Sequence, residues 1–229
     1  MMNFNSKTGL ILFLAVKGFK QHLFGSIAAA FSIALAGGLF LSTIKIQDQT
    51  QISFNNASGG FDAVLGARGS KLQLILNALF HLDSSPGNLP WEQYELIKKT
   101  PGVKEAYPIA VGDNYLGYRL VGTEPRLFVE HEWKKGQRYE LRRGRIFSSM
   151  AKEALVGSFV TQKLNLKIGD RFQPYHGLNF KEDTQHEDVF TVVGLLEPTG
   201  TPADKVIWVP IKGIQHMEGH DEALAQSVS

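Results

Sequence analysis

Residues 23–44 read LFGSIAAAFSIALAGGLFLSTI and decide the architecture of this chain, because none of these 22 residues is charged. As an α-helix rising 1.5 Å per residue, the run extends about 33 Å, which matches a hydrocarbon core of about 30 Å. A buried core helix is the alternative, but one of this length without a polar face is rare in soluble proteins. The run therefore predicts a transmembrane helix.

The charges on either side of this run predict its orientation. Residues 45–229 carry 21 basic and 22 acidic side chains, whereas residues 1–22 carry no acid and three lysines, Lys7, Lys17 and Lys20. Lysines concentrate on the cytoplasmic side of a first span. We therefore expect the chain in the inner (cytoplasmic) membrane, with its N-terminus cytoplasmic and the residues after about 45 extracytoplasmic.

A cleaved signal peptide is the second alternative, since Ala34-Leu35-Ala36 resembles a cleavage site. The apolar run continues beyond that site through Leu39-Phe40-Leu41, and the preceding polar region is long for a signal peptide. These two features favour a retained span. Both readings place most of the protein outside the cytoplasm.

The arm at residues 1–22 also has helical spacing, with Leu10, Phe13 and Leu14 on one side. Such a helix can lie in the membrane interface, where its lysines contact anionic lipid headgroups. The alternative is that it continues the membrane helix.

Composition excludes several classes of protein. Of the 229 residues, 43% are apolar and 20% charged, which argues against disorder, and the net charge of +2 is too small for a nucleic-acid binder. The chain has no cysteine, which excludes disulfides, thiolate zinc sites and a cysteine nucleophile.

The residues after the span predict a mixed, α+β fold in two modules. Helices are expected at 72–79, 91–100, 158–164 and 211–220, with Ser158 as an N-cap. Strands are expected at 62–65, 103–111, 115–123, 153–157, 171–175, 189–196 and 206–209. Gly112-Asp113-Asn114 is expected to make the reversal between the second and third of these strands.

Local motifs give no support for catalysis, and we expect no catalytic, cofactor or metal site. Gly66-Ala67-Arg68-Gly69-Ser70-Lys71 is rich in glycine but lacks the phosphate-loop spacing, so it is interpreted as a turn. No serine lies in GxSxG. The scattered acids Asp62, Asp83 and Asp113 are interpreted as turn formers.

The histidines leave a metal site as an open alternative. His216 and His220 are four residues apart, which would place both on one face of a helix beside Asp221. A polar loop carries four more potential ligands: His176, His186, Glu187 and Asp188. Solvated histidines are the favoured interpretation.

Residues 124–147 are strongly basic, with six cations and the single acid Glu140 between 134 and 145: Lys134, Lys135, Arg138, Arg142, Arg143 and Arg145. A solvated loop is the favoured interpretation. Contact with acidic lipid headgroups or with an acidic partner surface is the alternative.

Several short stretches, in this order and spacing, resemble a MacB/FtsX-like ABC transporter permease. They are Gly60-Phe61-Asp62-Ala63-Val64-Leu65-Gly66-Ala67-Arg68-Gly69-Ser70, Ala154-Leu155-Val156-Gly157, Leu164-Asn165-Leu166-Lys167-Ile168-Gly169-Asp170 and residues 190–204, FTVVGLLEPTGTPAD. None of these stretches is catalytic.

The resemblance implies one N-terminal span and a large periplasmic domain in which a porter-like α/β part holds a β-rich insertion. Here the porter-like part would comprise residues 45–144 and 199–229, and the insertion residues 145–198. A partner ABC ATPase would hydrolyse ATP, and a permease homodimer would pass its motion outward to export a substrate or activate a periplasmic partner.

The chain departs from this pattern because no apolar window after Ile44 is long enough to span a membrane, whereas the family has three later spans. We therefore expect a fragment, a truncated product or half of a split permease. A membrane-anchored periplasmic binding module without an ATPase is the second hypothesis, and an anchored metal-dependent enzyme is the third.

Overall fold

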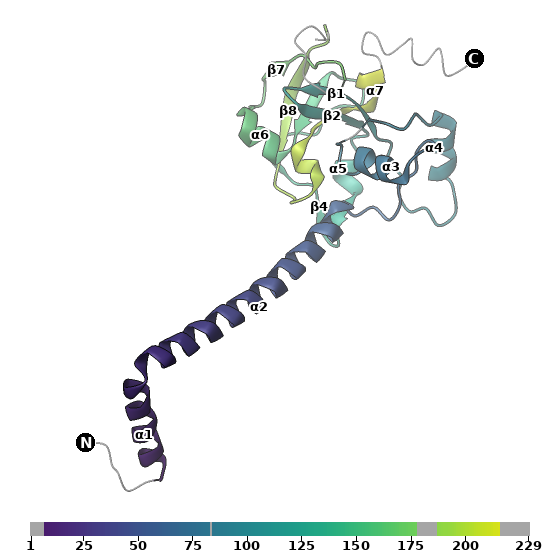
Figure 1. Cartoon of the computed structure of the whole chain (residues 1–229). Coiled ribbons are helices and arrows are strands. Elements are labelled where there is room, and N and C mark those ends of the chain that lie inside the picture. Colours follow the sequence, from purple (N-terminus) through teal and green to yellow (C-terminus); the bar gives the residue numbers. More distant parts are fainter. Residues whose placement is uncertain (1–6, 83, 178–186, 216–229) are drawn as a thin grey trace. The chain divides into compact units, whose positions relative to one another are not determined.

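The computed structural model describes residues 7–82, 84–177 and 187–215, which fall into two compact units, Met1–Ile52 and Ser53–Ser229 (Figure 1). The first unit holds α1 (Lys7–Gln21) and most of α2 (Leu23–Ala57), and a turn at His22 separates the two helices. The arm is therefore helical as predicted. Its position at the membrane interface stays a prediction.

The helix α2 contains the predicted span. Its part from Leu23 to Thr50 is long and apolar enough to cross a membrane, and none of its most apolar 18-residue window is buried. Phe24 and Ile33 expose 92% and 73% of their surfaces. Apolar side chains this exposed distinguish α2 from the core helix of a soluble protein.

The second unit is built on a seven-stranded mixed sheet, which confirms the mixed α/β class predicted. Six strands follow the order β1 (Ala110–Tyr115), β2 (Tyr118–Thr123), β9 (Ile207–Pro210), β6 (Glu153–Val156), β8 (Phe190–Leu196) and β5 (Leu141–Gly144). The short β7 (Arg171–Phe172) pairs with β8. The pairs β2–β9 and β6–β8 are parallel, and the other pairs are antiparallel. A separate hairpin joins β3 (Glu132–Lys134) to β4 (Gln137–Arg138).

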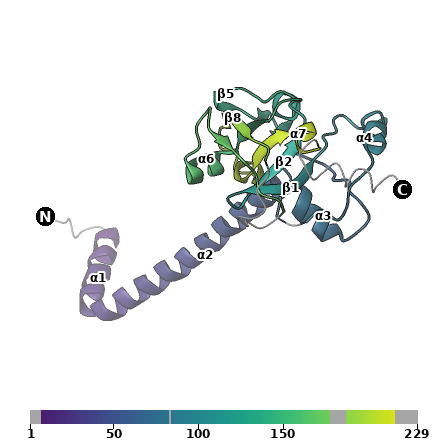
Figure 2. The same ribbon diagram turned by 90° about the horizontal axis from the view of Figure 1, so that it is seen from above.

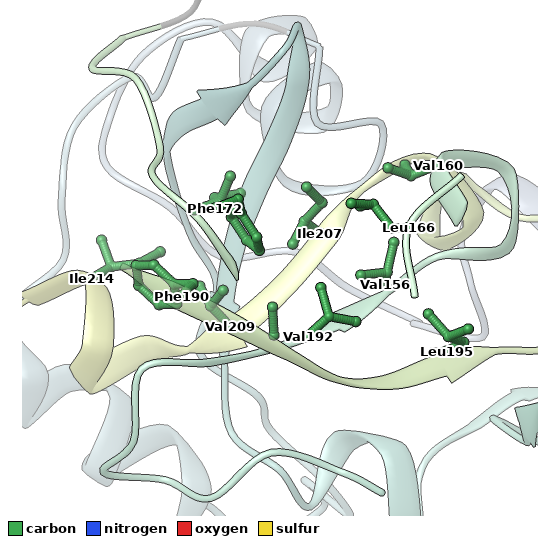
Figure 3. Close-up of a cluster of buried hydrophobic side chains, with 12 residues drawn as sticks. Val156, Val160, Leu166, Phe172, Phe190, Val192, Leu195, Ile207, Val209 and Ile214 are labelled. Atoms are coloured by element: carbon green, nitrogen blue, oxygen red, sulfur yellow. The ribbon is translucent and has the colours of Figure 1, made fainter. Parts of the chain in front are cut away.

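Both faces of this sheet are buried, which explains the nearly unbroken apolar runs in its central strands. Alternate residues point to opposite faces. In β6, Ala154 and Val156 belong to one apolar cluster and Leu155 to the other. Figure 3 shows the first cluster, where Phe190, Val192, Ile207 and Val209 from β8 and β9 face Val160, Leu166 and Ile214.

Helices cover the sheet from two sides. Val160 of α6 (Ser158–Leu164) and Ile214 pack in the first apolar cluster on one face, whereas Leu127 and Phe128 pack in the second cluster on the other face. The helices α3 (Lys71–Ala78) and α4 (Trp91–Lys98) lie at the edge of the domain opposite α6 in both views (Figures 1 and 2). Two short helices complete the domain, α5 (Leu127–Glu130) and α7 (Ile211–Gln215), with a 3₁₀ turn at Pro202–Lys205.

Four local predictions are wrong. Residues 62–65 and 103–109 form no strand. The reversal between β1 and β2 lies at Leu116-Gly117, both with positive φ, and Asn114 supports it by accepting the Gly117 N–H at 3.1 Å. Asp113 and Asn114 lie inside β1. Ser158 is the first residue of α6, whose N-cap is Gly157.

Two further predictions stay open. Strands from residues 45–144 and 199–229 share one sheet with strands from 145–198, so the boundary of a β-rich insertion is a prediction that the sheet does not mark. The predicted helix at 211–220 is seen at Ile211–Gln215, and its remainder lies outside the described residues.

Candidate functional site

The chain enters the outer domain through a tight turn directly after α2. Ser58 accepts the backbone N–H of Phe61 at 3.1 Å, and Gly59 and Gly60 have φ of 58° and 83°. A Cβ on Gly60 would lie 2.3 Å from the backbone oxygen of Glu132. Glycine is therefore needed at position 60 for both its backbone angle and its close contact with another segment.

The ring of His131 binds this turn to the rest of the outer domain. It is buried, it stacks on Phe61 with 4.2 Å between ring centroids, and its Nε2 lies 2.7 Å from the backbone oxygen of Gly59. The carbonyl can only accept, so Nε2–H is the donor. The other ring nitrogen, Nδ1, lies 3.6 Å from a carboxylate oxygen of Glu105.

Glu105 connects His131 to Tyr107, whose hydroxyl donates to the carboxylate at 3.0 Å. Burial acts to raise the pKa of Glu105, but the hydrogen bonds from Tyr107 and Lys104 outweigh it and the pKa is lowered. Burial, followed by the neighbouring Glu105 carboxylate, raises the pKa of Tyr107. Glu105 is therefore the acceptor and the neutral phenol the donor at neutral pH.

Arg126 extends these contacts to α4. Its guanidinium lies 4.4 Å from the centre of the Tyr107 ring, and its Nη2 donates to the Tyr94 hydroxyl at 3.1 Å. Glu124 accepts from Arg126 at 2.5 Å and from Tyr94 at 3.0 Å. Burial acts to lower the pKa of Arg126, but Glu124 and Tyr94 raise it overall. We call the turn at residues 58–61 the exit turn. The residues that connect it to α4 form the junction network: Gly59, Phe61, Tyr94, Glu105, Tyr107, Glu124, Arg126 and His131.

Two of the stretches that carry the family resemblance contact each other at a hydrogen-bonded corner formed by residues 199–204. The Asp204 carboxylate accepts hydrogen bonds from the backbone N–H of Thr199 and of Gly200 and from the Thr199 hydroxyl, at 2.7 to 3.1 Å. Gly157 packs against this corner, since a Cβ on it would lie 2.5 Å from the backbone oxygen of Asp204. These motif residues therefore have a structural role.

The candidate chemical residues are not gathered into one group of metal ligands among the described residues. There, no group of three histidine, aspartate or glutamate side chains could hold a metal ion. His176 lies 3.4 Å from the buried Asp113. Asp188 pairs with Lys152, and Glu187 is exposed. Four candidates lie outside the described residues: Asp83, His186, His216 and His220; so does Asp221.

The glycine-rich segment at 66–71 caps a helix. The Ser70 hydroxyl accepts the Gln73 N–H at 3.4 Å and is the N-cap of α3. Asp62, on the same loop, is exposed. The basic segment is surface: all six of its cations are exposed, Arg138 lies 3.8 Å from Glu132, and Arg145 lies 2.5 Å from Glu153.

Comparison with known families agrees with this architecture. The model of the MacB-like periplasmic core domain matches residues 25–227, nearly the whole chain. No curated protein matches the chain. The matched domain is that of non-catalytic transporter subunits. The chain therefore belongs to the MacB-like periplasmic core domain family, which is typical of the permeases of MacB/FtsX-type ABC transporters.

Proposed function

We propose that this chain is the N-terminal portion of an ABC permease subunit, which transmits motion from a partner ATPase to an extracytoplasmic domain. Family membership supports the proposal, and the junction network carries it. A helix that moves in the membrane can displace an outer domain only if the connection between them is stiff, and buried hydrogen-bonded contacts supply such stiffness. The motion would serve export of a substrate or activation of a periplasmic partner.

The proposal includes a location. The N-terminus would be cytoplasmic and the residues after about 45 would lie outside the inner membrane, because the lysines of the arm precede the span. The permease would act as a homodimer with an ABC ATPase on the cytoplasmic side.

Topology gives the first test. A periplasm-active reporter fused after residue 60 is expected to be active, and the same reporter fused before residue 23 inactive, because only the first fusion would cross the membrane. The fusion protein should remain in the membrane fraction. A soluble product that begins near Gly37 would contradict the retained span.

Coupling gives the second test, which uses the chain purified with whatever ATPase accompanies it in its native membranes. A spin label on α4, at Gln93→Cys, would report motion relative to a label on α2, since the chain has no native cysteine. ATP is expected to change the distance between the labels. Replacing His131 with alanine should reduce this change roughly five-fold or more, as expected for a coupling energy of about 1 kcal/mol or above.

Two hydroxyl variants separate coupling from general damage. Tyr107→Phe removes the donor to Glu105 and should also reduce the change, whereas Tyr118→Phe removes a hydroxyl with no hydrogen bond to a described residue and should not. ATPase binding should persist in all variants.

If no ATPase accompanies the chain and the isolated protein retains a ligand instead, the anchored binding module is the correct reading.

A further inference from the structure

The β3–β4 hairpin carries positive charge that the fold does not neutralise. Lys134 and Lys135 stand exposed at its tip, and neither has an ion-pair partner among the described residues. Glu132, the acid in the same hairpin, is already engaged, because one carboxylate oxygen accepts the Gly136 N–H at 2.9 Å and the other lies 3.8 Å from Arg138. The tip therefore presents two ammonium groups that no acid among the described residues pairs with.

The hairpin is braced, so these lysines have a fixed base. The indole N–H of Trp133 donates to the backbone oxygen of Arg138 at 3.0 Å. The guanidinium of Arg138 in turn donates to the backbone oxygen of Val129, in α5, at 3.3 Å. A braced surface loses less conformational freedom on binding than a free loop does.

Contacts place the base of this hairpin beside the first residues after α2. The Cβ position of Gly60 is 2.3 Å from the backbone oxygen of Glu132, and 3.0 Å from the Trp133 backbone. The preceding Gly59 is bound by His131. Ala57 ends α2, so the hairpin is attached within three residues of the end of the membrane helix.

Helix length then limits the distance to the membrane surface. The 28 residues from Leu23 to Thr50 extend about 42 Å, close to the thickness of about 40–45 Å of a bilayer with its headgroups. The seven residues from there to Ala57 add about 10 Å, which is slightly more than the Debye length of about 8 Å at physiological salt. The two strand residues after Glu132, Trp133 and Lys134, together with a lysine side chain, are long enough to cover this distance of about 10 Å.

We propose that the β3–β4 hairpin docks on anionic phospholipid headgroups next to α2 and so fixes the base of the outer domain to the membrane surface. Lysines near an anionic surface are attracted to it, and tryptophan is enriched at membrane interfaces. Val129 adds an apolar contact, because 55% of it is exposed beside the hairpin. The proximity to the membrane helix favours lipid over an acidic protein. The proposal rests on the retained span of the proposed function and needs no ATPase.

The test places a donor fluorophore on the hairpin of the whole chain in nanodiscs. Gln137→Cys supplies a single labelling site because the chain has no cysteine. A trace of acceptor-labelled lipid reports approach to the headgroups. Energy transfer should be higher in discs containing phosphatidylglycerol than in phosphatidylcholine alone, and high salt should abolish the difference. The double variant Lys134→Gln/Lys135→Gln should lower the docking equilibrium about twenty-five-fold, since each lysine contributes about five-fold.

The matched control removes the same charge elsewhere on the outer domain. Lys98 and Lys99 form another exposed pair, at the end of α4, so Lys98→Gln/Lys99→Gln should leave the transfer unchanged. Equal transfer in neutral and anionic discs would overturn the proposal, as would an equal loss in both double variants. Binding of the labelled hairpin to polyglutamate in neutral discs, without a response to phosphatidylglycerol, would assign the surface to an acidic protein instead. None of these results bears on the coupling measurement, which uses a different readout.

Discussion

Gly157→Ala is expected to destabilise the outer domain by about 3 kcal/mol or more, although alanine is usually tolerated at such backbone angles. Gly157 has φ −63° and ψ 150°, which any residue adopts, so no backbone strain arises. The added methyl group would instead lie 2.5 Å from the backbone oxygen of Asp204 and 2.6 Å from that of Ala203. Alanine gains less than about 1 kcal/mol by restricting the unfolded chain, so the steric cost prevails.

The corner that receives this methyl group cannot easily move away. Asp204 fixes the backbone of Thr199 and Gly200, and Trp208 donates its indole N–H to the Ala203 oxygen at 3.2 Å. A shift of the corner would break these buried hydrogen bonds, each worth about 1 kcal/mol, and more if a group is left unsatisfied. The overlap must therefore be relieved by separating β6 and α6 from the corner.

Thermal and denaturant unfolding of the whole chain in detergent would measure this effect through tryptophan fluorescence. A loss of 3 kcal/mol corresponds to roughly 6–12 °C in Tm for a domain of this size. The control is Gly213→Ala in α7, where the new methyl group would have an ordinary contact at 3.6 Å with Phe190. That variant should be neutral or slightly stabilised, because alanine favours helix. Equal stability of the two variants would show that the corner yields.

The sequence predicted best those elements whose evidence lies within one segment. The span at 23–44 is readable from its length and lack of charge, and α4 from Pro90 before it and Pro101-Gly102 after it. The central strands β8 and β9 are readable as apolar runs because both faces of the sheet are buried along them. Each of these signals lies within one segment and needs no distant partner to be read.

The failures arise where a distant segment decides the local structure. Asn114 has the composition of a turn residue, yet its side chain donates to the Gly177 oxygen at 2.9 Å and its backbone exchanges hydrogen bonds with Tyr175. This pairing with residues some sixty positions away holds it in β1. Ala63, Val64 and Leu65 are apolar, but among the described residues no neighbouring strand completes a ladder with them.

The junction network was not predictable for the same reason. Gly59, Glu105 and His131 lie far apart in the sequence and share no motif spacing. They come together only in the folded domain, where His131, at the end of α5, contacts Gly59 in the exit turn. The nearest local signal was Gly59-Gly60 after a helix, which indicates a turn and says nothing about its partner.

Acid is expected to destabilise the outer domain through His81. This histidine follows α3, has φ 56°, and is buried with its ring edge-on to Trp208 at 5.6 Å. Burial lowers its pKa from 6.5 to about 4; the Asn77 carbonyl opposes this, and the charge of Arg119 adds to it. The folded domain thus holds a neutral imidazole against α3, β2 and β9.

The sign of the effect follows from the direction of this shift. The unfolded chain takes up a proton at His81 as pH falls below about 6.5, whereas the folded domain does so only near 4. Stability from this group is therefore complete above pH 6.5 and declines as the pH falls towards 4, below which both states are protonated. A shift from 6.5 to about 4 corresponds to a loss of at most about 3 kcal/mol.

Denaturant unfolding of the whole chain at pH 7, 6, 5 and 4 would measure this loss, with His81→Asn as the variant that removes the titrating group. Asparagine tolerates positive φ better than other side chains do, so the backbone can keep its conformation. The variant should be less stable at pH 7, because it loses the ring contact with Trp208, but its stability should fall less steeply towards pH 4. Carboxylates act in both proteins and cancel in the difference. Gly213→Ala retains every titrating group and should show the slope of the unaltered chain. If His81→Asn shows that slope too, then protonation of His81 is not what weakens the fold in acid.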